Sequence, residues 1–239
     1  MGRTSDARER LLAAALDLIW TSSYGSVSVD DICVRAGVKK GSFYHFFPSK
    51  ADLALSAYEE HWRLKQPSLD AIFSPLVPPL ERISRWCDSV YEAQDSLFQR
   101  FGHVCGCPYA NLGAELATQD DRLRAKSEEL LNRGLRYLES AIGDAQRDGL
   151  IHVADVKAAA QSVATCLMGL IFRAKVQNNP SLLRELEPSV MHILGAAVPA
   201  GIVAARARRA RADVARVADA VSVGVVALRR RVERPGQPL

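Results

Sequence analysis

Apolar residues recur at helical spacing along almost the whole chain. In the segment 7–23 they follow the i, i+4, i+7, i+8 spacing of one buried helix face, which is made by Leu11, Ala15, Leu18 and Ile19. No run of useful length alternates with the period of two that a strand requires, and no internal repeat is visible. The pattern therefore predicts an all-α fold.

Capping signals divide the N-terminal part into short helices. Ser28 followed by Asp31 resembles a capping box, and the helix that it starts ends at Gly37, a residue suited to a left-handed C-terminus. A short helix then runs to Pro48, and Ser49 caps a longer helix that is predicted to end near residue 65. Two helices about a glycine-containing turn form the helix-turn-helix pattern, whose second helix enters the major groove of DNA.

Four prolines follow the longer helix. Pro67, Pro75, Pro78 and Pro79 predict a loop or a broken helical connection over residues 66–79. Further helices are expected at about 80–101, 108–118, 120–148, 155–177 and 188–198.

The second helix of the helix-turn-helix pattern lies within residues 39–47, KKGSFYHFF. Lysine and serine donate to base edges or phosphates, and a tyrosine hydroxyl and an imidazole N–H are phosphate donors. Phe43, Phe46 and Phe47 are expected to pack inward. Packing alone does not require basic residues beside them, so the basic residues favour a DNA-binding role. The candidate DNA contacts are Ser28, Lys39, Lys40, Ser42, Tyr44, His45 and Lys50.

The pattern extends over residues 8–58, which read RERLLAAALDLIWTSSYGSVSVDDICVRAGVKKGSFYHFFPSKADLALSAY. This segment resembles the DNA-binding domain of the tetracycline-repressor-like (TetR) transcriptional regulators. The resemblance implies a dimeric all-helical repressor that binds palindromic double-stranded operator DNA. It also implies a second helical domain that binds a small effector and dimerises through its last two long helices.

We therefore expect three parts in the chain. A helix-turn-helix domain over 1–50 and a helical effector-binding and dimerisation domain over 51–199 precede a basic Ala/Arg/Val-rich tail over 200–239, which is expected to be a flexible appendage. Their net charges are +2, −4 and +6, so the pI near 8.9 owes most to the tail. A broad apolar stripe in 155–177 predicts the homodimer interface, although a monomer core also needs such a stripe.

The predicted effector domain holds an unusual segment, FGHVCGCPYANLGAEL, at residues 101–116. Three interpretations are open. Cys105 and Cys107 are either small buried hydrophobes, or ligands with His103 in a soft-metal site of a metal-responsive repressor, or reactive thiols. Three alternating ligands without a fourth fall short of the usual zinc spacings, so we expect no metal.

The segment GCPYANLGAEL also resembles, less specifically, a TetR branch that includes electrophile- and oxidant-sensing regulators, in which a later helix bears a lysine. Lys175 stands at the matching place here. A cation beside Cys107 would lower the pKa of its thiol and favour the reactive thiolate. Cys105, Cys107, Tyr109 and Lys175 are therefore the candidate effector or sensor residues.

Other classes of function are less well supported. The five histidines are scattered, and no Ser-His-Asp order, phosphate loop or HExxH motif suggests an enzyme, so no catalytic residue and no cofactor is expected. An odd count of five cysteines, with no signal peptide and no membrane-length apolar run, favours a cytoplasmic protein with no membrane partner. A helical adaptor dimer that does not bind DNA would explain the apolar helices but not the lysines before Phe43.

Overall fold

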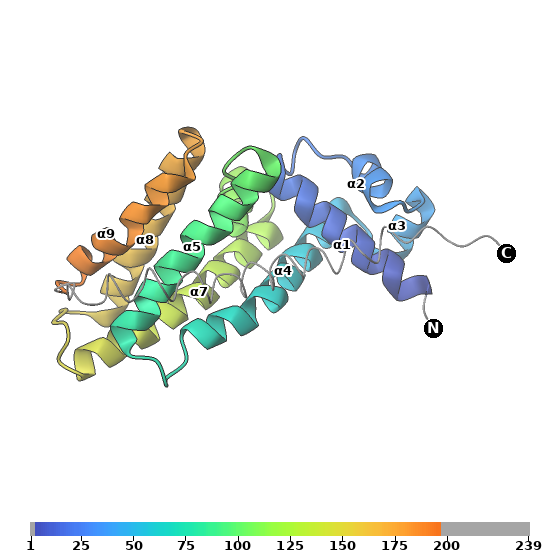
Figure 1. Ribbon diagram of the computed structural model, residues 1–239. Helices are drawn as coiled ribbons and strands as arrows, with labels where there is room; N and C mark the ends of the chain where they lie inside the picture. The colour runs from blue at the N-terminus through green and yellow to red at the C-terminus, as the bar shows by residue number, and fades with distance from the viewer. Residues whose placement is uncertain (1–2, 197–239) are drawn as a thin grey trace.

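The computed structural model describes residues 3–196, and every regular element in that part of the chain is helical (Figure 1). The helices are α1 (Arg3–Thr21), α2 (Val29–Ala36), α3 (Lys40–Phe46), α4 (Lys50–Ile72), α5 (Pro79–Phe101), α6 (Pro108–Leu116), α7 (Asp121–Arg147), α8 (Val156–Val176), the 3-10 helix η1 (Pro180–Glu185) and α9 (Leu186–Ile193). The prediction of an all-α fold is confirmed.

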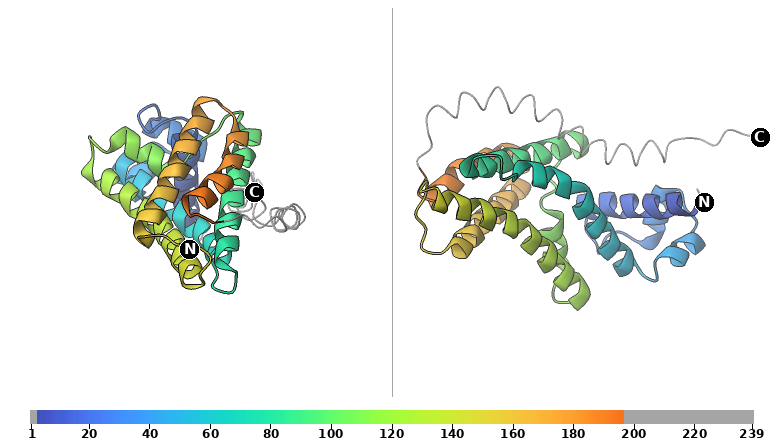
Figure 2. Two further views of the ribbon diagram at one scale, coloured as in Figure 1. Left: turned by 90° about the vertical axis from the view of Figure 1, so that its left-hand side faces the viewer. Right: turned by 90° about the horizontal axis from the view of Figure 1, so that it is seen from below.

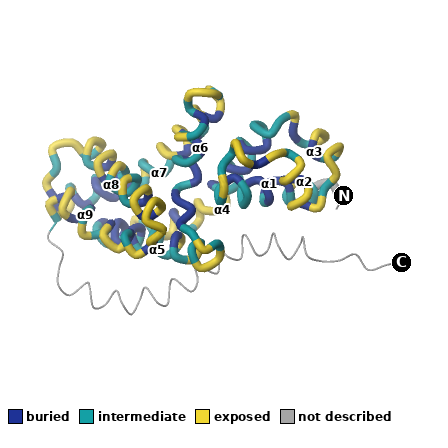
Figure 3. Tube along the Cα trace, turned by 90° about the horizontal axis from the view of Figure 1, so that it is seen from above, coloured by how far each residue is buried: buried dark blue, intermediate teal, exposed yellow. Residues whose placement is uncertain are grey.

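The helices form two packed groups that share α4. Helices α1–α3 lie at one end of the molecule, and α5, α7, α8 and α9 lie at the other, as Figure 1 and the right-hand view of Figure 2 show. Helix α4 packs along α1 at its start and reaches α5 and α7 further on. Helix α6 stands between the two groups (Figure 3). The boundary expected at residue 50 coincides with the start of α4, a helix that belongs to both groups.

The N-terminal group is held by side chains from all of its helices. Leu11, Ile32, Phe43 and Leu53 come from α1, α2, α3 and α4 in turn, and each is completely buried. Burying a side chain of this size stabilises a fold by about 1.5–3 kcal/mol. This small core fixes the angle between α2 and α3.

Helix α4 continues seven residues beyond the end that the sequence predicts. The loop expected over 66–79 is wrong for its first part, because α4 contains Pro67 and ends only at Ile72. A proline inside a helix removes one backbone hydrogen bond and costs about 3 kcal/mol relative to alanine. Packing compensates for this cost, since Leu69 and Phe73 are buried and the Phe73 ring lies 5.2 Å from that of Tyr137 on α7.

The larger group buries one ion pair between long helices. Arg82 of α5 is 4% exposed and pairs with Asp144 of α7, and it also donates to the carbonyl oxygens of Val77 and Pro75. These contacts supply hydrogen-bond acceptors to a guanidinium group that is buried away from water. They attach the α4–α5 loop to α7.

The last described helix begins and ends earlier than predicted. The sequence predicts a helix over 188–198, whereas α9 begins at Leu186, directly after η1, and ends at Ile193. Gly195 has a φ of 63°, and the N–H groups of Gly195 and Ala196 bond back to His192 and Met191. This is a Schellman ending, which only a residue tolerant of positive φ allows without strain. The predicted tail over 200–239 lies outside the described residues.

Candidate DNA-binding and effector sites

The turn between α2 and α3 is set by local hydrogen bonds. Ser28 and Asp31 form the predicted capping box at the start of α2, with the Ser28 hydroxyl accepting from the Asp31 N–H at 3.1 Å. Gly37 ends α2 with a φ of 62°, and its N–H bonds back to the Val34 carbonyl oxygen. The αL geometry at Gly37 turns the chain toward α3 in two residues.

Helix α3 has an inner and an outer face. Phe43 and Phe47 are buried and Phe46 is half-buried. Lys39, Tyr44 and His45 are exposed, and 53% of Tyr44 is accessible. The exposed side therefore carries a cation, a phenol and an imidazole on one short helix with no covering element among the described residues.

Three of the other predicted DNA contacts, Ser28, Lys40 and Lys50, have side-chain partners inside the protein. Lys40 pairs with Asp30 of α2 at 2.8 Å, which ties α2 to α3, and Ser42 is half-buried. The Ser28 hydroxyl serves the capping box.

Lys50, at the start of α4, also has partners inside the protein. Its ammonium donates to the carbonyl oxygens of Tyr24 and Val27, each at 2.8 Å, and lies 4.0 Å from the centre of the Tyr24 ring. The α1–α2 loop thus folds around Lys50.

Cys107 is the N-cap residue directly before α6 and is half-buried. Burial raises the pKa of its thiol, and the backbone N–H of Ala110, the ammonium of Lys65 and the backbone N–H of Tyr109 oppose that effect. The net effect is a pKa of the Cys107 thiol above its ordinary value. Lys65 is the cation that acts on this sulfur, and the sequence pattern did not identify it.

An aromatic cluster surrounds the start of α6. The Tyr109 hydroxyl lies 2.8 Å from Nδ1 of His61, and the His61 ring lies 5.2 Å from that of Trp20 on α1. The Tyr58 ring is 6.0 Å from that of Tyr109. Burial lowers the pKa of His61 to about 3, so this imidazole is neutral near pH 7. The cluster joins α1, α4 and α6 next to Cys107.

Lys175 lies on the other side of the loop that carries the cysteines. A Cβ at Gly106 would come within 3.4 Å of the Lys175 side chain, and Lys175 opposes the burial that raises the pKa of Cys105 to about 11. Lys175 thus lies beside Gly106 and its charge acts on Cys105, whereas the charge of Lys65 acts on Cys107. The pairing of Lys175 with Cys107 that we inferred from the resemblance does not appear among the interactions of the described residues.

The residues of the alternative metal site do not converge. Both ring nitrogens of His103 lie near backbone carbonyl oxygens, of Phe101 at 3.0 Å and of Thr21 at 3.1 Å, and Cys105 is directed at the His103 carbonyl oxygen. No group of three or more His, Cys, Asp or Glu side chains that could hold a metal occurs within residues 3–196. The metal-responsive alternative has no support in this arrangement.

The cysteine segment and α6 form direct hydrogen bonds with the end of α1 and with the α1–α2 loop. The Trp20 indole N–H donates to the Gly106 carbonyl oxygen at 2.9 Å. At the other end of α6, the Glu115 carboxylate accepts from the backbone N–H groups of Tyr24 and Gly25 at 2.9 and 2.6 Å. Helix α6 therefore touches the effector candidates at its first turn and the α1–α2 loop at its last.

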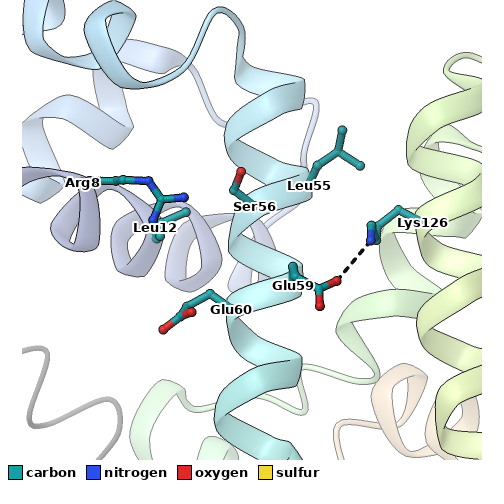
Figure 4. Close-up of a pocket in the computed structure, with 7 residues that line it drawn as sticks. All are labelled: Arg8, Leu12, Leu55, Ser56, Glu59, Glu60 and Lys126. Carbon is teal, nitrogen blue, oxygen red and sulfur yellow. Dashed lines mark hydrogen bonds and ion pairs between the residues drawn. The ribbon is translucent and has the colours of Figure 1, made fainter. Parts of the chain in front are cut away.

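An open groove of about 300 Å³ separates α1 from α7 over the surface of α4 (Figure 4). Arg8 and Leu12 of α1 line one side, and Lys126 of α7 lines the other. Glu59 on α4 pairs with Lys126 at 3.1 Å and also with Arg133 of α7 at 2.8 Å. These ion pairs bridge α4 to the larger helical group beside the groove.

An exposed recognition helix on a three-helix core, attached to a separate helical group, defines a helix-turn-helix transcriptional regulator. The family model for "Bacterial regulatory proteins, tetR family" matches residues 11–57, and that for "Tetracyclin repressor-like, C-terminal domain" matches residues 79–190. The chain belongs to the TetR family of transcriptional regulators. This membership contradicts the alternative of a helical adaptor dimer that does not bind DNA. It agrees with the expectation that the protein is not an enzyme.

Relatives match most of the chain. The transcriptional regulator AcuR of Cereibacter sphaeroides is 32% identical over 181 residues, which is 75% of this chain and 81% of AcuR. The transcriptional repressor NemR of Escherichia coli K12 is 24% identical over 194 residues, 79% of this chain and 92% of NemR.

Solved structures have the same fold. A crystal structure of a regulatory protein TetR from Rhodobacter sphaeroides superposes with a TM-score of 0.71 at 30% identity, and covers 78% of this chain and 98% of its own. The reduced form of E. coli NemR superposes with a TM-score of 0.69 at 23% identity, covering 81% of this chain and all of its own, which shows the fold alone. No helix in residues 3–196 is both long and apolar enough to cross a membrane.

Proposed function

We propose that the protein is a homodimeric cytoplasmic repressor that binds a palindromic operator through α3 and leaves it when a small effector or an electrophile acts at Cys107. The observation that carries the proposal is the outward face of α3, where Lys39, Tyr44 and His45 are exposed next to buried Phe43. Basic and hydrogen-bonding groups on an uncovered helix can bind the base edges in a DNA major groove and the phosphates beside it.

The other predicted DNA contacts are expected to contribute less to the affinity than the exposed face of α3. They are Ser28, Lys40, Ser42 and Lys50. Lys40 and Lys50 use their internal partners to position α3 and the α1–α2 loop, and Ser28 uses its partner to cap α2. A side chain with an internal partner still donates to phosphate through its remaining protons. We expect Lys39 to contribute most to the affinity, because it is exposed and unpaired among the described residues.

The dimer is supported by the outer face of α8. Thr165 and Gly169 are exposed there, and Phe172 and Val176 are 67% and 69% exposed. Large apolar side chains on an uncovered helix face favour helix-to-helix packing with a second copy. Sedimentation should show a dimer for the unaltered chain and a monomer for Phe172→Asp. A dimer that persists in that variant would place the interface elsewhere.

The DNA-binding part is tested by selecting sequences from a random duplex library with the full-length protein. The selected sequence should be a palindrome with nanomolar affinity that falls linearly on a log–log plot against salt. Lys39→Ala should lower the slope of that plot by about 1.8, because each protomer of the dimer loses one phosphate contact, while the exposed Lys157→Ala of α8 leaves it unchanged. Failure to enrich any sequence would refute operator binding.

The effector part is supported by the position of Cys107 at the head of α6, which also contacts the α1–α2 loop. Adding a group to the Cys107 sulfur would displace its neighbours in a packed region and change the loop that supports α2 and α3. Cys107→Ser should keep the operator affinity and lose release by hypochlorite or N-ethylmaleimide. Cys166→Ser, which changes a half-buried thiol on α8, is the control and should still be released.

A further inference from the structure

Two adjacent carboxylates at the start of α2 have different partners. The carboxylate of Asp31 accepts from the backbone N–H and the hydroxyl of Ser28, at 2.8 and 2.6 Å, and so belongs to the capping box. The carboxylate of Asp30 instead reaches across the turn to Lys40, the first residue of α3. Its two oxygens lie 2.8 and 3.0 Å from the Lys40 Nζ. The cap of α2 therefore depends on Asp31, which leaves Asp30 for another role.

The Asp30–Lys40 ion pair lies on the open side of the helix-turn-helix. The side chains of Asp30 and Lys40 are 65% and 55% exposed. Tyr44 follows Lys40 by four residues on the same side of α3 and is 53% exposed. A Cβ added at Gly41 would meet nothing within 4 Å beyond its chain neighbours and the backbone of α3. The ion pair therefore shares the uncovered surface of α3 that is proposed to bind the operator.

A carboxylate on this surface needs a reason beyond the stability of the fold. An exposed ion pair contributes little to stability, because water already solvates both charges well. Near DNA the carboxylate is repelled by the phosphates, which weakens binding to every sequence. That loss is offset only where a base offers a hydrogen-bond donor. In the major groove, acidic side chains accept from the N4 amino group of cytosine.

The spacing of the two charged groups matches the edge of one G·C base pair. In the major groove cytosine presents its N4 amino group as a donor, and guanine presents O6 and N7 as acceptors. N4 and O6 are hydrogen-bonded to each other within the base pair, about 2.9 Å apart. The Asp30 oxygens and the Lys40 nitrogen are 2.8 and 3.0 Å apart and offer the complementary acceptor and donor. An ammonium has three N–H donors and a carboxylate about four acceptor sites, so both groups keep capacity for a base.

We propose that Asp30 and Lys40 together read one G·C base pair in each half of the operator. Lys40 donates to O6 or N7 of the guanine, and Asp30 accepts from the N4 amino group of the paired cytosine. The inference rests on the proposed binding of operator DNA and adds a residue that determines the operator sequence. Asp30 lowers the affinity for DNA in general and thereby selects against sites that lack this base pair.

Selection from a random duplex library tests the proposal on the full-length protein and three variants. For the unaltered protein, replacing one particular G·C pair by A·T should weaken binding by about tenfold per half-site. Asp30→Ala and Lys40→Met should both lose that preference and keep the preferences at all other positions. Asp30→Ala should also bind unrelated DNA more tightly, because a repulsive charge is removed. The control Asp121→Ala, which breaks an exposed ion pair with Arg124 in the first turn of α7, should change neither property.

A modified base tests the contact of Asp30 directly, without any change in the protein. N4-methylcytosine still pairs with guanine but carries a methyl group in place of the amino proton that faces the major groove. Placed at the selected G·C pair, it should weaken binding of the unaltered protein by about tenfold per half-site. Asp30→Ala should bind the methylated and unmethylated operators about equally, because it makes no contact with that proton.

Three results would overturn the proposal. They are a half-site that requires no G·C pair, base preferences that Asp30→Ala leaves unchanged, and loss of different positions in Asp30→Ala and Lys40→Met. Circular dichroism shows whether each variant folds. If one does not, the methylated operator decides, since unchanged affinity with N4-methylcytosine at every G·C pair of the half-site also overturns it. Enrichment of no sequence by the unaltered protein shows instead that the proposed operator binding itself fails.

Discussion

Replacement of Lys50 by methionine separates two roles for this residue. The sequence pattern predicts a phosphate contact for Lys50, whereas its ammonium donates to two carbonyl oxygens of the α1–α2 loop. Methionine keeps the apolar stem of the side chain and removes the charge and the donors. The variant therefore tests the ammonium alone.

We expect Lys50→Met to destabilise the protein by about 2 kcal/mol. Each hydrogen bond from a charged donor contributes about 1.5–3 kcal/mol, and the contact with the Tyr24 ring adds about 0.5–1 kcal/mol. The expected loss is smaller than their sum, because the ammonium no longer has to leave water. The pKa of Lys50 is lowered by this burial, which shows the same cost.

The measurements are urea unfolding and operator affinity as a function of salt. A loss of about 2 kcal/mol corresponds to a fall in Tm of about 4–8 °C for a chain of this size. The salt slope should remain that of the unaltered protein. Unchanged stability together with a slope lowered by about 1.8, as for Lys39→Ala, would show that Lys50 contacts phosphate and that the structural reasoning is wrong.

Three further predictions concern other features. Glu115→Gln should reduce stability by about 1–2 kcal/mol and weaken operator binding, because one of the two backbone N–H groups loses its charged acceptor; equal affinity would show that the contact does not position the DNA-binding helices. Pro67→Ala should raise stability by about 1–3 kcal/mol in urea unfolding, and a loss would show that the proline shapes α4. Burial, with the charge of Asp88, raises the pKa of Glu92 from 4.5 to about 7, so the native state retains a proton that the unfolded state releases. Stability should therefore fall as the pH rises from about 4.5 to about 7, and Glu92→Gln should remove that slope.

The parts of the fold with local signals could be predicted from the sequence. The capping box at Ser28 and the left-handed Gly37 depend on neighbours in the chain, and both occur where the pattern places them. The end of α4 could not be predicted, because the helix passes Pro67 only through contacts with α7, which is far along the sequence. The ending of α9 at Gly195 had a local signal, a glycine, that the prediction of a helix over 188–198 overlooked.

The candidate effector site also combines features with a local sequence signal and features that only the tertiary fold creates. The unusual cysteine segment is visible in the sequence, and so is its resemblance to sensor proteins. The cation that acts on Cys107 is not, since Lys65 is one of several charged residues on an ordinary helical stretch of α4. Its role follows from the packing of α4 against α6, which brings together residues that are more than 40 positions apart. Glu115 is similar, since only the tertiary fold brings it to Tyr24.

Trp20 gives this protein an internal optical reporter. Its indole belongs to α1, yet it donates to Gly106 and lies against His61, so it stands where the two helical groups meet. The emission of an indole depends on its hydrogen bond and on imidazole groups nearby. Rearrangement at Cys107 that alters the Gly106 carbonyl should therefore change the fluorescence spectrum before DNA is released. With Trp62 and Trp86 replaced by phenylalanine, the remaining fluorescence would come from Trp20. Stopped-flow measurements of that fluorescence would give the rate of the conformational change that starts at Cys107, without any attached dye.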